Sequence, residues 1–208
     1  MKIKNMSKKI WIDAGHFNND MGFVSKQNIK EAEETKKIRD ALKPLLVDYE
    51  VIYVPDALSL KETIEFINNI ATTESFAISI HLNSNSNTLI RGTEAYYYSG
   101  PRYAEVFSRH VATTLGIPNR GAKPDTQTAV GSLGFLRLLK CHSTLVECAY
   151  MTNVADMERY TPQKAAQGIK NAIEELFPIQ KRETNILVEI IRSAIALAQK
   201  ALLILQRK

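Results

Sequence analysis

The chain of 208 residues has little cysteine and no long hydrophobic run. Its two cysteines, Cys141 and Cys148, flank one apolar segment and form no Cys-x-x-Cys pair, so we expect buried free thiols rather than a disulfide framework or a metal site. No stretch of about 18 uncharged apolar residues occurs, so no membrane-spanning helix is predicted. Only residues 10–12 separate the basic start from Asp13, which is too short for a secretory signal. We therefore expect synthesis in the cytoplasm without a signal peptide, and action on an external substrate only after release.

A basic surface interleaved with aromatic residues is also missing. The net charge is +5, but residues 179–208 carry six Lys or Arg and two Glu, so the rest of the chain is nearly neutral. Nucleic-acid-binding domains concentrate Lys and Arg on one face. Nucleic acid is therefore not an expected partner.

Apolar periodicity predicts strands that alternate with helices over residues 1–178. The predicted strands are 9–13, 50–54, 76–81, 93–98 and 144–149, with a further candidate at 135–139. The predicted helices are 30–46, 59–71 and 101–115, followed by two helices capped by Asn153 and Thr161. Ser59 is the expected N-cap of the second helix, with Glu62 three residues later. Residues 117–134, rich in Gly, Pro, Asn and Asp, are expected to form a loop or irregular hairpin. This alternation is typical of an α/β domain with a mostly parallel sheet between helical layers.

Residues 179–208 form a separate, basic amphipathic tail in this interpretation. Between Asn185 and Gln206 two adjacent apolar stripes follow helical spacing, and only a narrow strip is polar. The stripes are Leu187, Ile190, Ala194, Leu197, Ala201 and Ile204, and Val188, Ile191, Ile195, Ala198, Leu202 and Leu205. A helix this apolar needs a partner, so we expect homo-oligomerisation, contact with a membrane surface, or docking on the main domain.

Four side chains stand where short apolar runs meet polar loops: His16, Glu31, His81 and Glu147. Two histidines and a glutamate are a known ligand set of catalytic zinc, with water in the fourth position. Glu147 interrupts the apolar run 145–149, where a carboxylate is costly unless it is paired or used. It is suited to act as the general base for a zinc-activated water.

Each proposed ligand also has a plainer interpretation. His16 could bond a loop, and His81, which precedes polar residues, could belong to a turn. Glu31 could be a solvated charge at a helix start, where the helix dipole favours it, and Glu33 and Glu34 compete with it for the ligand position.

The remaining candidates carry the same ambiguity. Glu147 could be a structural carboxylate paired with an arginine. His110, in a predicted helix, and His142, just before a predicted strand, are expected to be structural.

Four segments together resemble the signature blocks of zinc-dependent N-acetylmuramoyl-L-alanine amidases, the family of bacterial autolysins and phage endolysins. The segments occur in family order, and the resemblance covers about residues 9–177. They are residues 12–16 (IDAGH), 30–33 (KEAE), 79–83 (SIHLN) and 145–153 (LVECAYMTN), supported by 92–97 (GTEAYY) and 119–123 (NRGAK). Phe17-Asn18-Asn19 replaces the usual glycines after the first histidine, so substrate preference can differ.

The resemblance implies a catalytic domain over residues 1–178 with a central sheet of about six strands. It implies one zinc ion held by His16, Glu31 and His81, with Glu147 as the catalytic carboxylate. The implied reaction cleaves the amide between N-acetylmuramic acid and L-alanine in peptidoglycan, a bacteriolytic activity typical of an endolysin. The alternatives are a wall-binding module without catalysis and a cytosolic amidase acting on soluble muropeptides.

Overall fold

The computed structural model describes residues 8–17, 19–179 and 182–205, and the chain divides into two compact units, Met1–Phe177 and Pro178–Lys208. Parts of the predicted tail, residues 180–181 and 206–208, lie outside the described residues, as does Asn18. The two units are considered separately.

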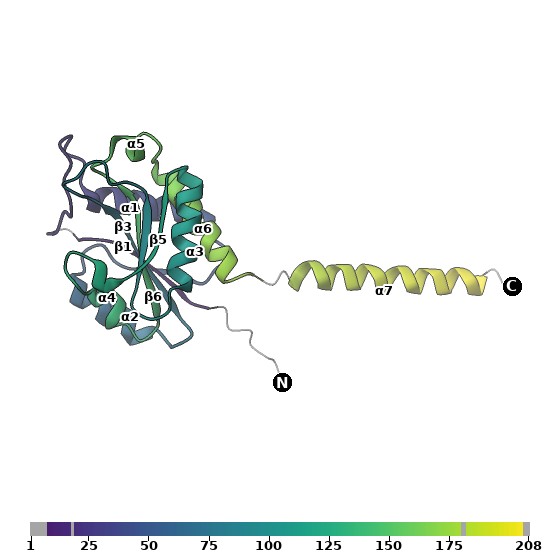
Figure 1. The fold of residues 1–208 in the computed structure, drawn as a ribbon. Coiled ribbons are helices and arrows are strands. Elements are labelled where there is room, and N and C mark those ends of the chain that lie inside the picture. Colours follow the sequence, from purple (N-terminus) through teal and green to yellow (C-terminus); the bar gives the residue numbers. More distant parts are fainter. Residues whose placement is uncertain (1–7, 18, 180–181, 206–208) are drawn as a thin grey trace. The chain divides into compact units, whose positions relative to one another are not determined.

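The first unit is built on a six-stranded sheet (Figure 1). Its strands are β1 (Ile10–Ala14), β2 (Val51–Tyr53), β3 (Phe76–Asn83), β4 (Thr93–Tyr97), β5 (Asn119–Pro124) and β6 (His142–Tyr150). They lie in the order β2-β1-β3-β6-β4-β5, and every pair is parallel except β4–β6. The predicted mostly parallel, mixed sheet is therefore confirmed.

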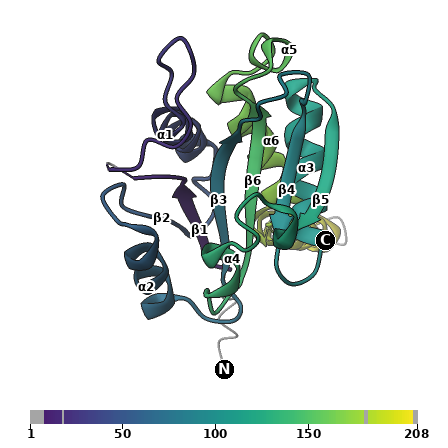
Figure 2. The same ribbon diagram turned by 60° about the vertical axis from the view of Figure 1, so that its left-hand side comes forward.

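Helices cover both faces of this sheet (Figure 2). They are α1 (Glu31–Leu42), α2 (Leu60–Ile70), α3 (Arg102–Leu115), α4 (Gly134–Arg137), α5 (Val154–Met157) and α6 (Pro162–Leu176), with short 3-10 turns at Lys43–Leu45 and Asp125–Gln127. The predicted caps form as expected: Ser59 and Glu62 make a reciprocal capping box at α2, and Asn153 and Thr161 cap α5 and α6.

Side-chain alternation along the strands divides the core into two layers, because successive residues of a strand point to opposite faces. Ile10, Ile12 and Ile78 pack with α1, α3 and α6 on one face. Trp11 and Leu145 pack with α2 and α4 on the other. The second layer is smaller, because α4 is only one turn long.

Two local predictions were wrong. Residues 135–139, predicted as a strand, begin within helix α4, because a short apolar run has no period that separates a strand from a buried helical turn. Residues 119–124, placed in a loop, form the edge strand β5. Its backbone pairs with β4, although its sequence NRGAKP has no apolar alternation.

The second unit contains α7 (Arg182–Leu205), a single helix of 24 residues. Its side chains are described only over residues 188–199, so the predicted apolar stripes before and after them lie outside the described side chains. Among the described residues, no helix is long and apolar enough to cross a membrane.

Candidate metal centre

The sheet places His81 and Glu147 next to each other. They are register partners on the parallel pair β3–β6, and Glu147 is in turn the partner of Glu94 on β4. Glu147 shares its side of β6 with Leu145, which packs toward α2 and α4, and a strand keeps residues two apart on one face. The row His81, Glu147 and Glu94 therefore lies across three central strands on the face that α2 and α4 only partly cover.

His16 reaches the same place from the loop after β1. Gly15 donates its N–H to the Ile80 carbonyl at 2.9 Å, which holds this loop against β3. A Cβ at Gly15 would lie 2.3 Å from the His81 imidazole, so only glycine fits between them. His16 itself adopts the left-handed backbone conformation, with a φ of 70°. Such strain in a non-glycine residue is typical of functional sites.

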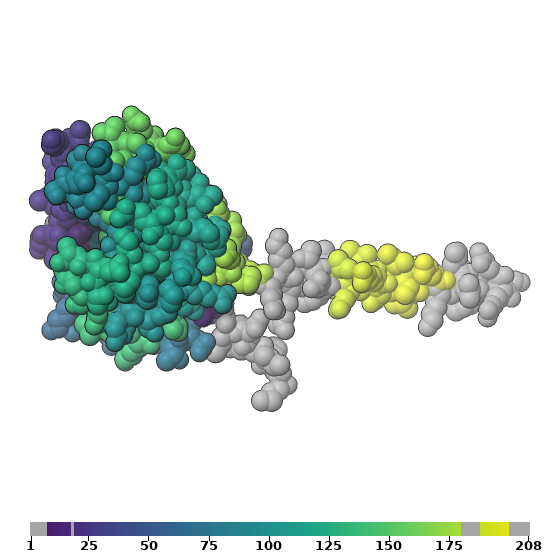
Figure 3. Space-filling model, in the orientation of Figure 1, coloured from purple at the N-terminus to yellow at the C-terminus, as the bar shows by residue number. Residues whose placement is uncertain are grey.

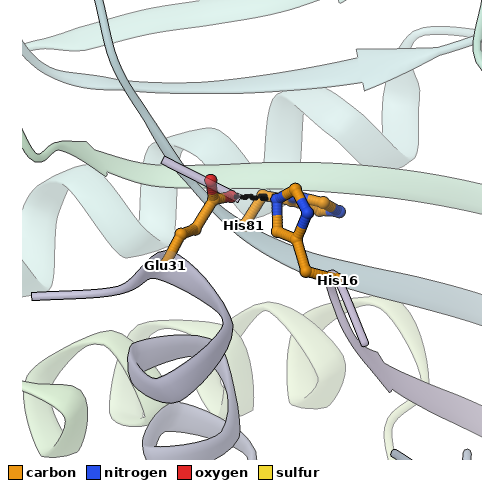
Figure 4. Close-up of side chains that lie close together, drawn as sticks. All are labelled: His16, Glu31 and His81. Carbon is orange, nitrogen blue, oxygen red and sulfur yellow. Dashed lines mark hydrogen bonds and ion pairs between the residues drawn. The ribbon is translucent and has the colours of Figure 1, made fainter. Parts of the chain in front are cut away.

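Glu31 comes from a third element, as the first residue of α1. Its Oε1 lies 3.0 Å from His16 Nε2 and 3.0 Å from His81 Nδ1 (Figure 4). The backbone N–H groups of Phe23 and Leu82 donate to the same carboxylate, at 3.1 and 3.2 Å. Its side chain is only 7% exposed, so the carboxylate is fixed in both position and orientation.

These three side chains fit a metal ion by their donor chemistry. One ligand atom from each of His16, Glu31 and His81 lies within 4.8 Å of the other two. Two imidazole nitrogens and one carboxylate oxygen suit zinc. Gly22 completes the cradle, because a Cβ there would lie 2.6 Å from both Glu31 and His16.

Asp20 orients the first histidine, and the sequence interpretation missed it. Asp20 Oδ2 lies 2.9 Å from His16 Nδ1, on the side of the ring opposite Glu31. Carboxylates that hold the second nitrogen of a ligand histidine fix its orientation and raise its basicity. The signal available in the sequence was a carboxylate four residues after His16 in a short polar loop.

Electrostatics in the cluster favour a charged network in the metal-free chain. Burial opposes charge on His16, but hydrogen bonds with Glu31 and Asp20 outweigh it and raise its pKa to about 9. Burial would raise the pKa of Glu31, yet the hydrogen bonds from both histidines hold it well below its usual range. The pKa of His81 is also raised, because Glu31 outweighs the effect of burial. A cation such as zinc can replace these protons.

Glu147 differs from the other three because its Oε2 has no hydrogen-bond partner among the described residues. This oxygen is also buried, and the alternative of an arginine-paired structural carboxylate is therefore not supported. Burial raises its pKa to about 8, with His81 opposing the shift and Glu31 and Glu94 adding to it. A carboxyl with a pKa near neutral, beside the metal cradle, is suited to accept and return a proton.

Glu94 forms a second polar centre that the sequence interpretation did not identify. It is 1% exposed, and burial would raise its pKa, but its cationic and hydroxyl partners lower that pKa to about 2. The groups that donate to it belong to Asn83, Tyr96, Arg120, Lys123 and Tyr150. Glu94 therefore stays ionised beside Glu147 and fixes four strands at this end of the sheet.

A cavity of about 180 Å³ opens beside the cluster. His16, His81, Asp20 and Asp13 line its polar part, and apolar side chains from α2, α4 and β6 line the remainder. Ser79 donates to the partly buried Asp13 carboxylate at 2.7 Å.

The other candidate ligands lie in different contacts. Glu33 pairs with Lys30, and Glu34 pairs with Lys37 and accepts from the Tyr160 hydroxyl. His110 pairs with Glu175, which leaves it a structural role.

His142 packs against the Tyr103 ring, also away from the cluster. Cys141 and Cys148 are buried free thiols, as predicted.

Fold and site together define an α/β domain with a His-Glu-His centre suited to metal-assisted hydrolysis. The sequence model of the family Amidase_3, described as N-acetylmuramoyl-L-alanine amidase, matches residues 10–175. The chain therefore belongs to the N-acetylmuramoyl-L-alanine amidase family.

Several solved structures share the fold. The catalytic domain of CwlV, an N-acetylmuramoyl-L-alanine amidase from Bacillus (Paenibacillus) polymyxa var. colistinus, is 24% identical with a TM-score of 0.72, covering 83% of this chain and 99% of that one. The amidase AmiC2 of Nostoc punctiforme is 26% identical, with a TM-score of 0.70 and coverage of 81% and 96%. The catalytic domain of the CD27L endolysin, which targets Clostridia difficile, is 22% identical, with a TM-score of 0.61 and coverage of 81% and 97%. No curated protein sequence matches the chain.

Proposed function

We propose that this chain is a zinc-dependent amidase that hydrolyses the amide between the lactyl group of N-acetylmuramic acid and L-alanine in peptidoglycan. Family membership supports the reaction, and one observation carries the mechanism. Three ligand side chains from three separate elements converge within 4.8 Å, beside a buried carboxylate oxygen that has no hydrogen-bond partner among the described residues.

In this proposal His16, Glu31 and His81 hold the zinc ion. When bound there, zinc supplies a Lewis acid that lowers the pKa of water toward about 7 and polarises a carbonyl. Asp20 keeps a proton on His16 Nδ1, which leaves Nε2 free to act as a ligand. The backbone N–H groups of Phe23 and Leu82 hold Glu31 in place.

Glu147 moves the proton. Its unpartnered Oε2 accepts a proton from the attacking water and returns it to the nitrogen of the leaving L-alanine. The ionised Glu94 beside it discourages a second negative charge, which keeps the basicity of Glu147 high.

The test is the release of new L-alanine amino termini from purified cell walls by the purified protein. Release should stop when a chelator removes the metal and return when zinc is added. New reducing sugar ends without new amino groups would contradict the proposal.

The same assay separates the alternatives. A wall-binding module would sediment with sacculi and release no amines, whereas an amidase for soluble muropeptides would prefer fragments over intact sacculi. An endolysin-type role stays a prediction, which loss of turbidity of living cells exposed to the protein would test.

A further inference from the structure

Helix α7 carries an apolar surface that needs a partner. Within its described side chains, the large apolar residues Val188, Ile190, Ile191, Ile195 and Leu197 are between 41% and 70% exposed. Figure 3 shows the atoms of this segment in yellow. Burying such side chains against a partner is favourable, because it removes apolar surface from water.

The apolar residues fall into two seams rather than one. Ile190, Ala194 and Leu197 form the first, with the alternating spacing of four and three residues that marks a coiled-coil seam. The second seam consists of Val188, Ile191, Ile195 and Ala198. In the sequence the first seam continues with Leu187 before these residues and with Ala201 and Ile204 after them, and the second seam continues with Leu202 and Leu205.

The angle between the seams limits the number of helices. The second seam is displaced from the first by one residue, which is about 100° around a helix of 3.6 residues per turn. A two-stranded coil covers only one seam. In a closed ring, the directions from one helix to its two neighbours differ by about 90° for four helices and by about 108° for five. The angle of about 100° between the two seams lies between these values.

We propose that α7 assembles with copies of itself into a parallel bundle of four or five helices. The first seam of each helix packs on the second seam of the next, a heterologous contact that closes into a ring. The small side chains of Ala194 and Ala198 let the helices approach closely, and the β-branched residues of the second seam fill the core.

The polar strip favours this partner over a membrane surface. The strip holds Glu189, Arg192, Ser193, Gln199 and Lys200 in the sequence, so its charges are of mixed sign. Helices that lie on membranes are rich in Lys and Arg on the polar side and carry Trp or Phe on the other. No aromatic residue occurs in 182–205, and Glu189 beside Arg192 suits ion pairs at the outside of a bundle.

The experiment measures the mass of the full chain by sedimentation equilibrium across the micromolar range. One chain has a mass of 23.4 kDa, and we expect a four- to fivefold larger mass. Ile191→Glu and Leu197→Glu, one in each seam, should reduce the mass to that of the single chain. Ser193→Glu adds the same charge in the polar strip and should leave the large mass unchanged.

A wild-type mass of one or two chains would overturn the proposal, because a single chain has no copy of α7 to pack on and two chains cover only one seam of each helix. A monomer that co-sediments with phosphatidylglycerol vesicles would assign the surface to a membrane instead. Amine release from walls is a separate readout, so an inactive oligomer would leave this inference standing while rejecting the proposed function.

Discussion

At the scale of single residues, Glu147 and His81 lie side by side on neighbouring strands, but substitutions of the two are expected to have different effects. Glu147→Gln keeps the shape of the side chain but removes the proton acceptor, so kcat for amine release should fall by about 10²–10⁴-fold while zinc stays bound. His81→Ala should lose the zinc itself. Metal content by atomic emission, measured with the rate on each variant, checks both. A Glu147→Gln protein with full activity would reject the catalytic role.

Asp20 gives a second test at this scale, because it contacts the ligand set through His16 Nδ1. Asp20→Asn should weaken zinc binding by about 10–100-fold, since the amide holds the ring less strongly and does not raise its basicity. Competition with a coloured chelator measures the affinity. Asp48→Asn, at an exposed position far along the chain, is the matched control. Equal affinities of the two variants would show that Asp20 does not support the ligand.

At the scale of elements, the contact between α3 and α6 depends on one glycine in α6. A Cβ at Gly168 would lie 2.7 Å from Val111 Cα and 3.1 Å from the His110 carbonyl oxygen, both backbone atoms that cannot rotate away. Gly168→Ala should therefore destabilise the fold by about 1–3 kcal/mol, although alanine favours a helix more than glycine does.

Urea unfolding of Gly168→Ala measures this change. Gln163→Ala, at an exposed position of the same helix, serves as the control and should unfold like the wild type within about 0.5 kcal/mol. If Gly168→Ala unfolds at the same urea concentration as the control, then α3 and α6 can move apart to admit the methyl group with little loss of folding free energy.

Elements with a clear period or cap could be predicted from the sequence, and those defined by tertiary pairing could not. Ser59 with Glu62 marked the start of α2 because both capping partners are local. The edge strand β5 was missed because its strand conformation comes from pairing with β4.

The site shows the same division. His81 could be found because it stands at the end of an apolar run, and Glu147 because it interrupts one. Asp20 and Glu94 were missed because their roles depend on contacts in the folded chain.

At the scale of the whole molecule, the metal centre makes the stability of the fold depend on pH. Whether stability falls or rises with increasing pH depends on whether zinc is bound. In the chelated protein the pKa of His16 is raised to about 9 and that of Glu147 to about 8, so the folded state holds both protons more tightly than the unfolded state. The stability that they contribute is present at low pH. For Glu147 it is lost as pH rises from about 4.5 to 8, and for His16 as pH rises from about 6.5 to 9.

The chelated protein should therefore lose stability between pH 6 and pH 9, at up to about 1.4 kcal/mol per pH unit for each group. Zinc should reverse the trend, because it binds the deprotonated ligands and its stabilising effect grows as their protons leave. Urea unfolding at pH 6, 7.5 and 9, with chelator and with zinc, measures both slopes. The double variant His16→Gln/Glu147→Gln should reduce the slope of the chelated curve, leaving the part that comes from His81, and remove the gain from zinc. Parallel curves with and without zinc would mean that the ion does not bind through these protonated groups.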